Sequence, residues 1–246
     1  GDDIISYVDY QSFRASESET SFGTYVKSTG GYDFVAMQDP TPSSANSDPK
    51  IGPIVISEIM YNPTSDLDME EYIKLTNITG LPVTLQDTVK DITLANPAGS
   101  DITVPWSFTD GIEFTFSLGT TIPAYGSLII AKDTAAFTVA YGAIPGIQVL
   151  GPFTGSLANG GEDVELSKAG DKVEGVQYYI LQDRVNYNDA APWPTEPDGS
   201  GMALVRKDND AYGNDPINWE AGNPLDDAPT ITSLSDSPDP VVQGSN

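Results

Sequence analysis

The sequence predicts an all-β protein, and three features support this. Strand-forming residues occur in short runs, 23 glycines and 19 prolines are spread between those runs, and no window shows sustained helical periodicity. The 246 residues allow one large or two small domains, and an apolar content of 39% is sufficient for a packed core. We therefore expect short strands joined by turns rich in glycine and proline.

The clearest strand signal lies in residues 54–63, which read IVISEIMYNP. Apolar side chains occupy both alternating positions, as expected for a strand inside a sandwich of two sheets. Asn62 and Pro63 end this strand, because proline has no N–H for the ladder and biases the preceding residue towards extended or turn geometry. A second strand follows an acidic loop and covers residues 70–77, EEYIKLTN.

Further elements follow along the chain. Residues 112–116 alternate apolar and polar side chains, which indicates a strand. A short helix is expected over residues 134–141, with Asp133 or Thr134 as its N-cap. The Asn-Gly-Gly sequence at 159–161 supplies the positive backbone angles that a hairpin requires. Other strands are expected at 81–85, 92–94, 102–104, 121–132, 173–179, 183–187 and 202–207, with breaks at Pro97 and Pro105.

Several of these segments resemble the lamin tail domain family. The opening strands, with ISEIMYNP at 56–63 and EEYIKLTN at 70–77, are similar to the opening of that family, as are TIPAYGSLIIAK at 121–132 and SLANGGEDVEL at 156–166. Ala124 stands where family members usually have glycine. The family occurs at the ends of nuclear lamins and, often in tandem, in large secreted bacterial proteins. The resemblance implies an immunoglobulin-like β-sandwich and an extracellular or cell-surface location, and it implies no activity.

The two ends of the chain carry similar segments, which indicates an internal repeat. On this basis residues 49–227 form a complete lamin-tail-like unit, and residues 1–48 form the closing strands and linker of a preceding unit. Residues 228–246 are expected to be a linker and the first strands of a following immunoglobulin-like module. The parallel segments are 8–10 with 185–187, 22–27 with 202–207, and 34–36 with 219–221.

Composition excludes several classes of function. The 36 acidic and 11 basic residues give a net charge of −25, which would repel both nucleic acid and anionic membranes. The absence of cysteine and histidine removes disulfides, thiol nucleophiles, Cys or His zinc sites and Ser-His-Asp triads. No apolar run reaches the roughly 20 residues of a membrane-spanning helix, so we expect no membrane insertion.

The acidic excess also raises the question of bound Ca²⁺, because divalent cations would relieve the repulsion within the folded chain. Solvation of the acidic surface is the alternative, and the sequence leaves both open. Carboxylates at alternate positions in loops suit a cation that takes about 6 to 8 oxygen ligands. The candidate ligands form three groups: Glu58, Asp66, Asp68 and Glu70; Asp189 and Asp198; and Asp208, Asp210 and Asp215.

An aromatic group is the candidate for ligand binding. Trp193 lies between two prolines, and Tyr187 and Tyr212 are near it in the sequence. These rings would form either a stacking platform for a sugar or the cover of one end of a core.

The sequence therefore predicts a non-enzymatic structural or adhesive module of a large multidomain surface protein, with Ca²⁺ as a candidate stabilising ion. Its expected partners are neighbouring immunoglobulin-like or lamin-tail-like modules, in the same chain or by strand exchange that would build a filament. The alternative is a carbohydrate-binding or surface-binding accessory module of a secreted hydrolase. Paired carboxylates are abundant, but the sequence indicates no cleft in which two of them would work together.

Overall fold

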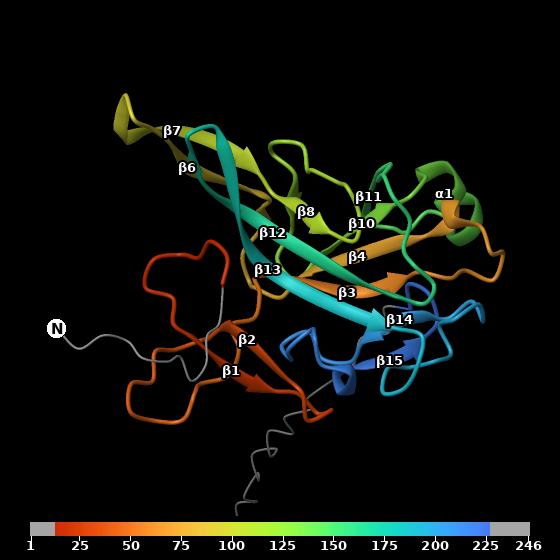
Figure 1. Ribbon diagram of the computed structural model, residues 1–246. Coiled ribbons are helices and arrows are strands. Elements are labelled where there is room, and N and C mark those ends of the chain that lie inside the picture. Colours follow the sequence, from red (N-terminus) through yellow and green to blue (C-terminus); the bar gives the residue numbers. More distant parts are fainter. Residues whose placement is uncertain (1–12, 227–246) are drawn as a thin grey trace, which may run out of the picture.

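The computed structural model describes residues 13–226, and two β-sheets dominate it (Figure 1). The six-stranded sheet has the order β11-β10-β4-β3-β14-β15. Its strands are β3 (Ile54–Met60), β4 (Tyr72–Asn77), β10 (Ser127–Ala131), β11 (Gln148–Leu150), β14 (Ala203–Arg206) and β15 (Trp219–Gly222). The expected all-β class is confirmed, with one α-helix added.

The second sheet has the order β13-β12-β6-β7, and β8 also pairs with β12. Its strands are β6 (Gln86–Thr93), β7 (Asn96–Pro105), β8 (Ser107–Asp110), β12 (Gly161–Val173) and β13 (Val176–Asn188). The smaller elements are β1 (Phe22–Val26) paired with β2 (Tyr32–Ala36), β5 (Val83–Thr84) paired with β9 (Thr121–Ile122), α1 (Thr134–Tyr141), η1 (Asp68–Glu70) and η2 (Pro216–Asn218).

The main core lies between the two sheets, and β3 is its central strand. All seven residues of β3 are buried. A shift in the β3–β4 register between Ile56 and Glu58 places Ile56 and Ile59 in the same core cluster, where strict alternation would separate them. Met60 instead joins a second cluster with Phe137 of α1. The two opening strands predicted from the sequence are therefore confirmed, and both of their faces are covered.

The local predictions differ in outcome. The helix at Thr134–Tyr141 is confirmed, and the Asp133 carboxylate caps it by accepting bonds from two backbone N–H groups. The hairpin expected at 159–161 is wrong, because Gly161 begins β12 and the β12–β13 connection turns at Glu174 and Gly175, both with positive φ. The part of the chain that is described contains no helix of the length and apolarity that a membrane span requires.

Of the two proline breaks expected, the one at Pro105 is confirmed, because β7 ends there, and the one at Pro97 is wrong. Residues 86–105 instead form the long β6–β7 hairpin, with Pro97 inside β7. Because β7 is an edge strand, a residue without an N–H is tolerated there. Residues 112–116 form isolated bridges at Glu113 and Thr115 in place of the expected strand.

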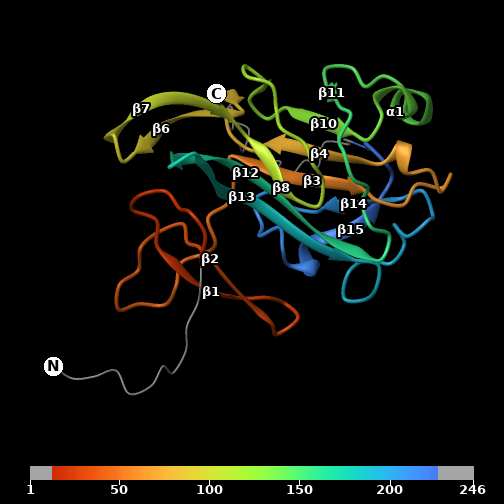
Figure 2. The same ribbon diagram turned by 45° about the horizontal axis from the view of Figure 1, so that its top comes forward.

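Residues 13–53 form an N-terminal arm that packs on the rest of the described chain, residues 54–226, which we call the body. Figures 1 and 2 show the β1–β2 hairpin of the arm beside β13 and below the loops around β14 and β15. Strand β1 pairs with β2 antiparallel, as β14 pairs with β15. The predictions for residues 8–10 and 228–246 lie outside the described residues.

A buried ion pair joins the two sheets. Asp183 of β13 and Arg206 of β14 lie 2.6 Å apart, and both side chains are almost fully buried. The Asp183 carboxylate also accepts a bond from the Ile56 N–H, and Arg206 donates to the Ile56 carbonyl. Three strands thus meet at one pair of charges.

We expect Arg206→Met to destabilise the protein by about 3–5 kcal/mol, because it leaves the Asp183 carboxylate buried without a cation. The matched control is Arg184→Met, which breaks a partly exposed pair with Asp163 and should cost less than about 1 kcal/mol. Urea unfolding measures both. Equal losses for the two variants would contradict a special role for the buried pair.

Candidate functional site

The docking site of the arm on the body is the most developed polar interface in the described residues. Its first anchor is Asp215, which precedes η2 and is only 1% exposed. Its carboxylate accepts bonds from the Ser28 N–H at 2.8 Å, the Ser28 hydroxyl, and the Tyr25 hydroxyl at 3.2 Å. Burial opposes ionisation of Asp215, but the bonds from Ser28, Ile217 and Tyr25 outweigh it and lower its pKa.

In the second anchor the carboxylate belongs to the arm and the donors belong to the body. Asp33 of β2 accepts bonds from the Tyr212 hydroxyl at 3.0 Å and the Asn214 amide at 2.9 Å. Burial first, and then the charge of Asp33, raises the pKa of Tyr212, so this phenol donates its proton. The arm and the loop 207–218 therefore each contribute one carboxylate and receive the other's hydrogen-bond donors.

The start of the arm is held by ion pairs to β12. Arg14 pairs with Glu165, and Glu17 pairs with both Lys168 and Lys50. Hydrogen bonds from Lys168 and then Lys50 lower the pKa of Glu17 to about 2. Between these contacts Ala15 forms a parallel bridge with Ile180 at the edge of β13.

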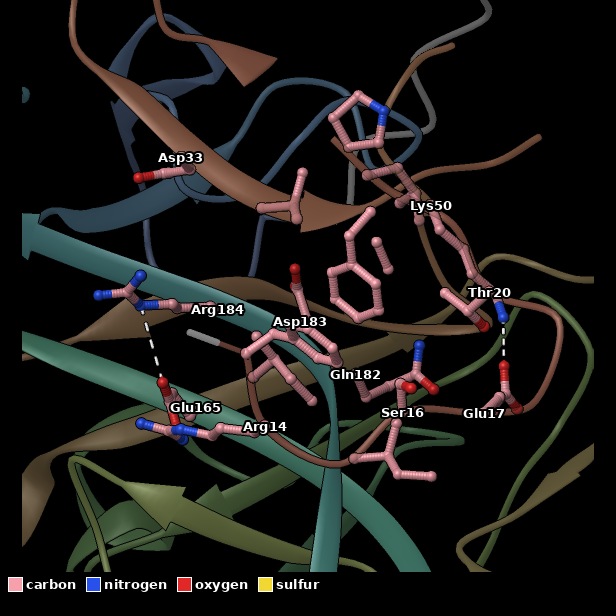
Figure 3. A pocket seen from close by; sticks show the side chains of 18 of the residues that line it. Arg14, Ser16, Glu17, Thr20, Asp33, Lys50, Glu165, Gln182, Asp183 and Arg184 are labelled. Atoms are coloured by element: carbon pink, nitrogen blue, oxygen red, sulfur yellow. Dashed lines mark hydrogen bonds and ion pairs between the residues drawn. The ribbon is translucent and has the colours of Figure 1, made fainter. Parts of the chain in front are cut away.

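A cleft of about 510 Å³ lies between the arm and β12–β13 (Figure 3). One wall carries a stack of aromatic rings, with centroids 5.0 Å apart for Phe13 and Phe22 and 5.8 Å apart for Phe22 and Phe34. The opposite wall comes from residues 180–184 of β13. Charged residues line the rim: Arg14, Glu17, Lys50, Glu165, Lys168 and Arg184. The volume is within the usual range of ligand pockets.

The structure does not gather the carboxylates predicted to bind Ca²⁺. Glu58 is buried, where it contacts Lys74 and accepts bonds from the Tyr72 hydroxyl and the Leu225 N–H. Asp66 and Asp68 are exposed, and Glu70 accepts a bond from Ser65.

The other predicted ligands have separate roles. Asp198 accepts a bond from Asn62 at 2.6 Å, and the partly buried Asp189 is in no group of three carboxylates among the described residues. Asp208 accepts a bond from the N–H of Asp210, and both are exposed. Asp215 holds the arm.

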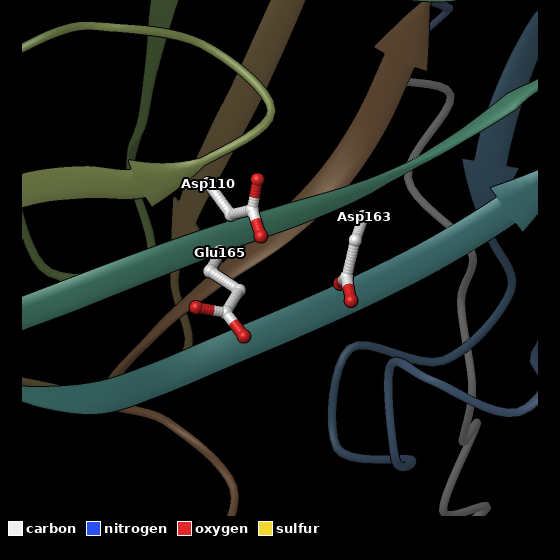
Figure 4. Close-up of side chains that lie close together, drawn as sticks. All are labelled: Asp110, Asp163 and Glu165. Carbon is white, nitrogen blue, oxygen red and sulfur yellow. The ribbon is translucent and has the colours of Figure 1, made fainter. Parts of the chain in front are cut away.

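A different group of carboxylates does gather. The ligand atoms of Asp110, Asp163 and Glu165 lie within 4.8 Å of one another, beside the cleft (Figure 4). Two of the three already have cationic partners, because Arg184 bonds to Asp163 and Arg14 bonds to Glu165. The alternation of Asp163 and Glu165 along β12 is visible in the sequence. Their proximity to Asp110 depends on the β8–β12 pairing, which the sequence does not reveal.

The aromatic group predicted to bind sugar lies inside the protein. Trp193 is 8% exposed and packs near Trp219, with ring centroids 6.2 Å apart. Tyr187 is 1% exposed and stacks on Tyr61. The Tyr212 hydroxyl donates a hydrogen bond to Asp33 of the arm. Trp193 and Tyr187 therefore belong to the main core, whereas Tyr212 is half-buried against the arm, and the three rings form no platform open to solvent.

A buried carboxylate outside the docking site also has an unusual pKa. Glu71 precedes β4 and is 1% exposed, and its pKa is raised to about 7. Burial is the main cause, and Asp68 and Glu162 add to it. The Leu157 N–H, which donates to Glu71 at 2.9 Å, and the charge of Lys132 act in the opposite direction.

Comparisons with known proteins found no match: no family model, no curated protein and no solved structure is similar to this chain.

We expect Ca²⁺ to bind the Asp110 cluster only in competition with the two arginines. Millimolar Ca²⁺ should therefore raise the melting temperature more in Arg14→Gln than in the natural chain, because a ligand that binds only the native state stabilises it. EGTA should reverse the rise. Arg14→Gln combined with Asp110→Asn is the control and should respond as the natural chain does. An equal response of all three proteins would exclude the cluster as the site.

Glu71 should make stability fall as the pH rises. Its folded-state pKa of about 7 exceeds the model-peptide value of 4.5, so the folded state binds more protons between these two values. Glu71→Gln should therefore gain roughly 1–3 kcal/mol over the natural chain at pH 8 and little at pH 4. Urea unfolding at both pH values measures the difference in unfolding free energy between the variant and the natural chain. The effect of the net charge is similar in both proteins and largely cancels in this difference. A difference that does not change with pH would contradict the assignment.

Proposed function

We propose that this chain is a non-enzymatic structural module of a larger extracellular or cell-surface protein, in which the closing hairpin of one unit docks on the body of the next. The observation that carries this proposal is the reciprocal anchoring of Asp33 and Asp215 between arm and body. The finer assignments, an immunoglobulin-like sandwich and a likeness to lamin tail domains, belong to the same proposal.

The contacts of the arm are those of a joint between modules. A flexible linker would make few specific contacts, whereas this arm has buried hydrogen-bonded anchors at its hairpin and ion pairs at its start. Repetition of such joints along a chain would fix the angle between neighbouring units and give a stiff array.

Docking within one polypeptide is preferred here over exchange between molecules. The arm continues directly into β3 of the body, so its effective concentration at its own docking site is high. Assembly into a filament by strand exchange would have to overcome this advantage. The second candidate function, a carbohydrate-binding module, receives no support from the buried Trp193.

Substitutions on the arm alone test the joint. In Ser28→Ala/Asp33→Ala the arm loses the hydroxyl donor to Asp215 and the acceptor for Tyr212 and Asn214, which should weaken docking by about 2–4 kcal/mol. Hydrogen exchange of the β1 and β2 amides should accelerate at least tenfold, and small-angle X-ray scattering should show a larger maximum dimension. Amides of β3 and β4 should keep their protection.

The matched control is Asp39→Ala/Ser44→Ala, which removes one carboxylate and one hydroxyl from exposed positions of the same arm. It should behave as the natural chain does. An arm that remains protected in Ser28→Ala/Asp33→Ala, or that is already open in the natural chain, would overturn the proposal. Electron micrographs of two copies joined in tandem then measure stiffness: a fixed angle between the copies supports the array, and a random angle contradicts it.

A further inference from the structure

The β1–β2 hairpin repeats the pairing of β14–β15. In the arm, Lys27 donates its N–H to the Gly31 carbonyl, and in the body Lys207 donates to Asn218. Antiparallel pairs alternate between bonded and non-bonded positions. It follows that Thr24 of β1 and Leu204 of β14, which occupy equivalent positions before these lysines, both direct their backbone groups away from the hairpin partner.

The outward edge of β14 is occupied in the body. There it pairs with β3, and Leu204 lies opposite Ile59. The equivalent edge of β1 pairs with no strand among residues 13–226. The Thr24 carbonyl instead accepts a bond from the side-chain amide of Asn46 at 3.0 Å. A single side chain thus occupies the place that a whole strand takes in the body.

One face of the same hairpin is apolar and incompletely covered. Cross-strand pairing puts Phe22, Val26, Tyr32 and Phe34 on one face together with Thr24. Leu204, the counterpart of Thr24, points into the main core. In the arm Val26 is 67% and Tyr32 is 64% exposed. Phe22 and Phe34 line the cleft beneath the arm.

We propose that the outer edge of β1, together with this apolar face, binds an extended strand with the apolar pattern of β3, supplied by the module that precedes this one in the same polypeptide. This inference rests on the proposed function and names the partner of the arm. Backbone bonds from β1 would replace the Asn46 amide, and alternate side chains of the strand would cover Phe22 and Phe34. Asn46 lies in the exposed segment 42–46, which has to move together with Phe13, whose ring stacks on Phe22.

Charge favours such an occupant. The chain has a net charge of −25, so most segments of a like protein would be repelled. A strand such as β3 carries one carboxylate in seven residues, and the remainder is apolar apart from one serine. It therefore matches the arm face in chemistry and avoids the general repulsion.

The probe is a synthetic peptide with the sequence of residues 53–62, PIVISEIMYN, carrying a lysine tag for solubility. The control peptide has the same composition and tag with its order permuted to destroy the alternation. Titration calorimetry against the full chain measures binding. We expect the natural peptide to bind at least tenfold more tightly than the permuted one, and Asn46→Ala to bind it at least threefold more tightly than the natural chain.

Thr24→Pro is the decisive variant. Because the Thr24 N–H points outward, proline removes a donor only from the outer edge and leaves the bonds between β1 and β2. Binding should fall at least tenfold, while hydrogen exchange at Tyr25 and Asp33 shows that the hairpin persists. Peptide binding that is unchanged in Thr24→Pro, or equal for the permuted peptide, would overturn the inference.

Light scattering of the full chain shows whether the edge of β1 binds a second copy of the chain or is free for the proposed strand. A monomer with peptide-dependent protection of Thr24 and Val26 supports the proposal. A dimer that Thr24→Pro dissociates would show that the edge serves another copy of the chain and would overturn it. The joint between arm and body is tested separately by Ser28 and Asp33, so a failure of this inference is distinguished from a failure of the proposed function.

Discussion

The ion pair between Asp183 and Arg206 is the constraint on which the rest of the structure depends. Both side chains are almost fully buried, so their hydrogen-bond partners come from each other, from the backbone of β3 and, for Arg206, from the Ala211 carbonyl. Hydrophobic burial alone allows two sheets to slide over one another, since apolar contacts have little direction. A bond of 2.6 Å between β13 and β14 fixes their relative position.

The same arginine shapes the loop that receives the arm. Arg206 also donates to the Ala211 carbonyl and lies over the Trp219 ring, 6.0 Å from its centroid. Gly213 lies so close to Asp183 that a Cβ at this position would come within 2.8 Å of the carboxylate oxygen. The indole of Trp219 then donates to the Gly213 carbonyl. Tyr212, Asn214 and Asp215 are therefore presented to the arm from a loop that is anchored in the core.

Local signals in the sequence predicted the elements whose causes are local. The apolar run of β3, the cap at Asp133 and the shared face of Phe137 and Tyr141 in α1 depend on residues close in sequence, and all three are found. Pro97 misled the interpretation because its effect depends on whether β7 is a central or an edge strand, which is a property of the whole sheet. The turn at 159–161 is present, with a positive φ at Gly161, but it leads into β12 and closes no hairpin, because β12 pairs with the strand that follows it.

The candidate site was harder to predict, because its residues come together only through the fold. Asp215 was predicted as a metal ligand, since a carboxylate in a polar loop suits a cation. The structure gives it hydroxyl and amide donors from a segment 187 residues away. For Trp193 the sequence left a sugar platform and a core cover both open, because flanking prolines say little about which side of a loop meets the core, and the ring is buried. The Asp110 cluster required the β8–β12 pairing, for which the sequence carries no short-range signal.

The distribution of charge explains how a strongly acidic chain keeps specific contacts. With 36 acidic and 11 basic residues, cations are scarce, and several are placed where segments distant in sequence meet. Arg14 and Lys168 join the arm to β12, and Arg206 joins β14 to β3 through the Ile56 carbonyl. Within residues 13–226 many of the remaining acidic side chains are exposed, and they oppose association with other copies, including pairing between exposed strand edges. Under such repulsion a partner must offer either matched cations or an apolar strand, and the arm has both: ion pairs at its start and an apolar face on its hairpin.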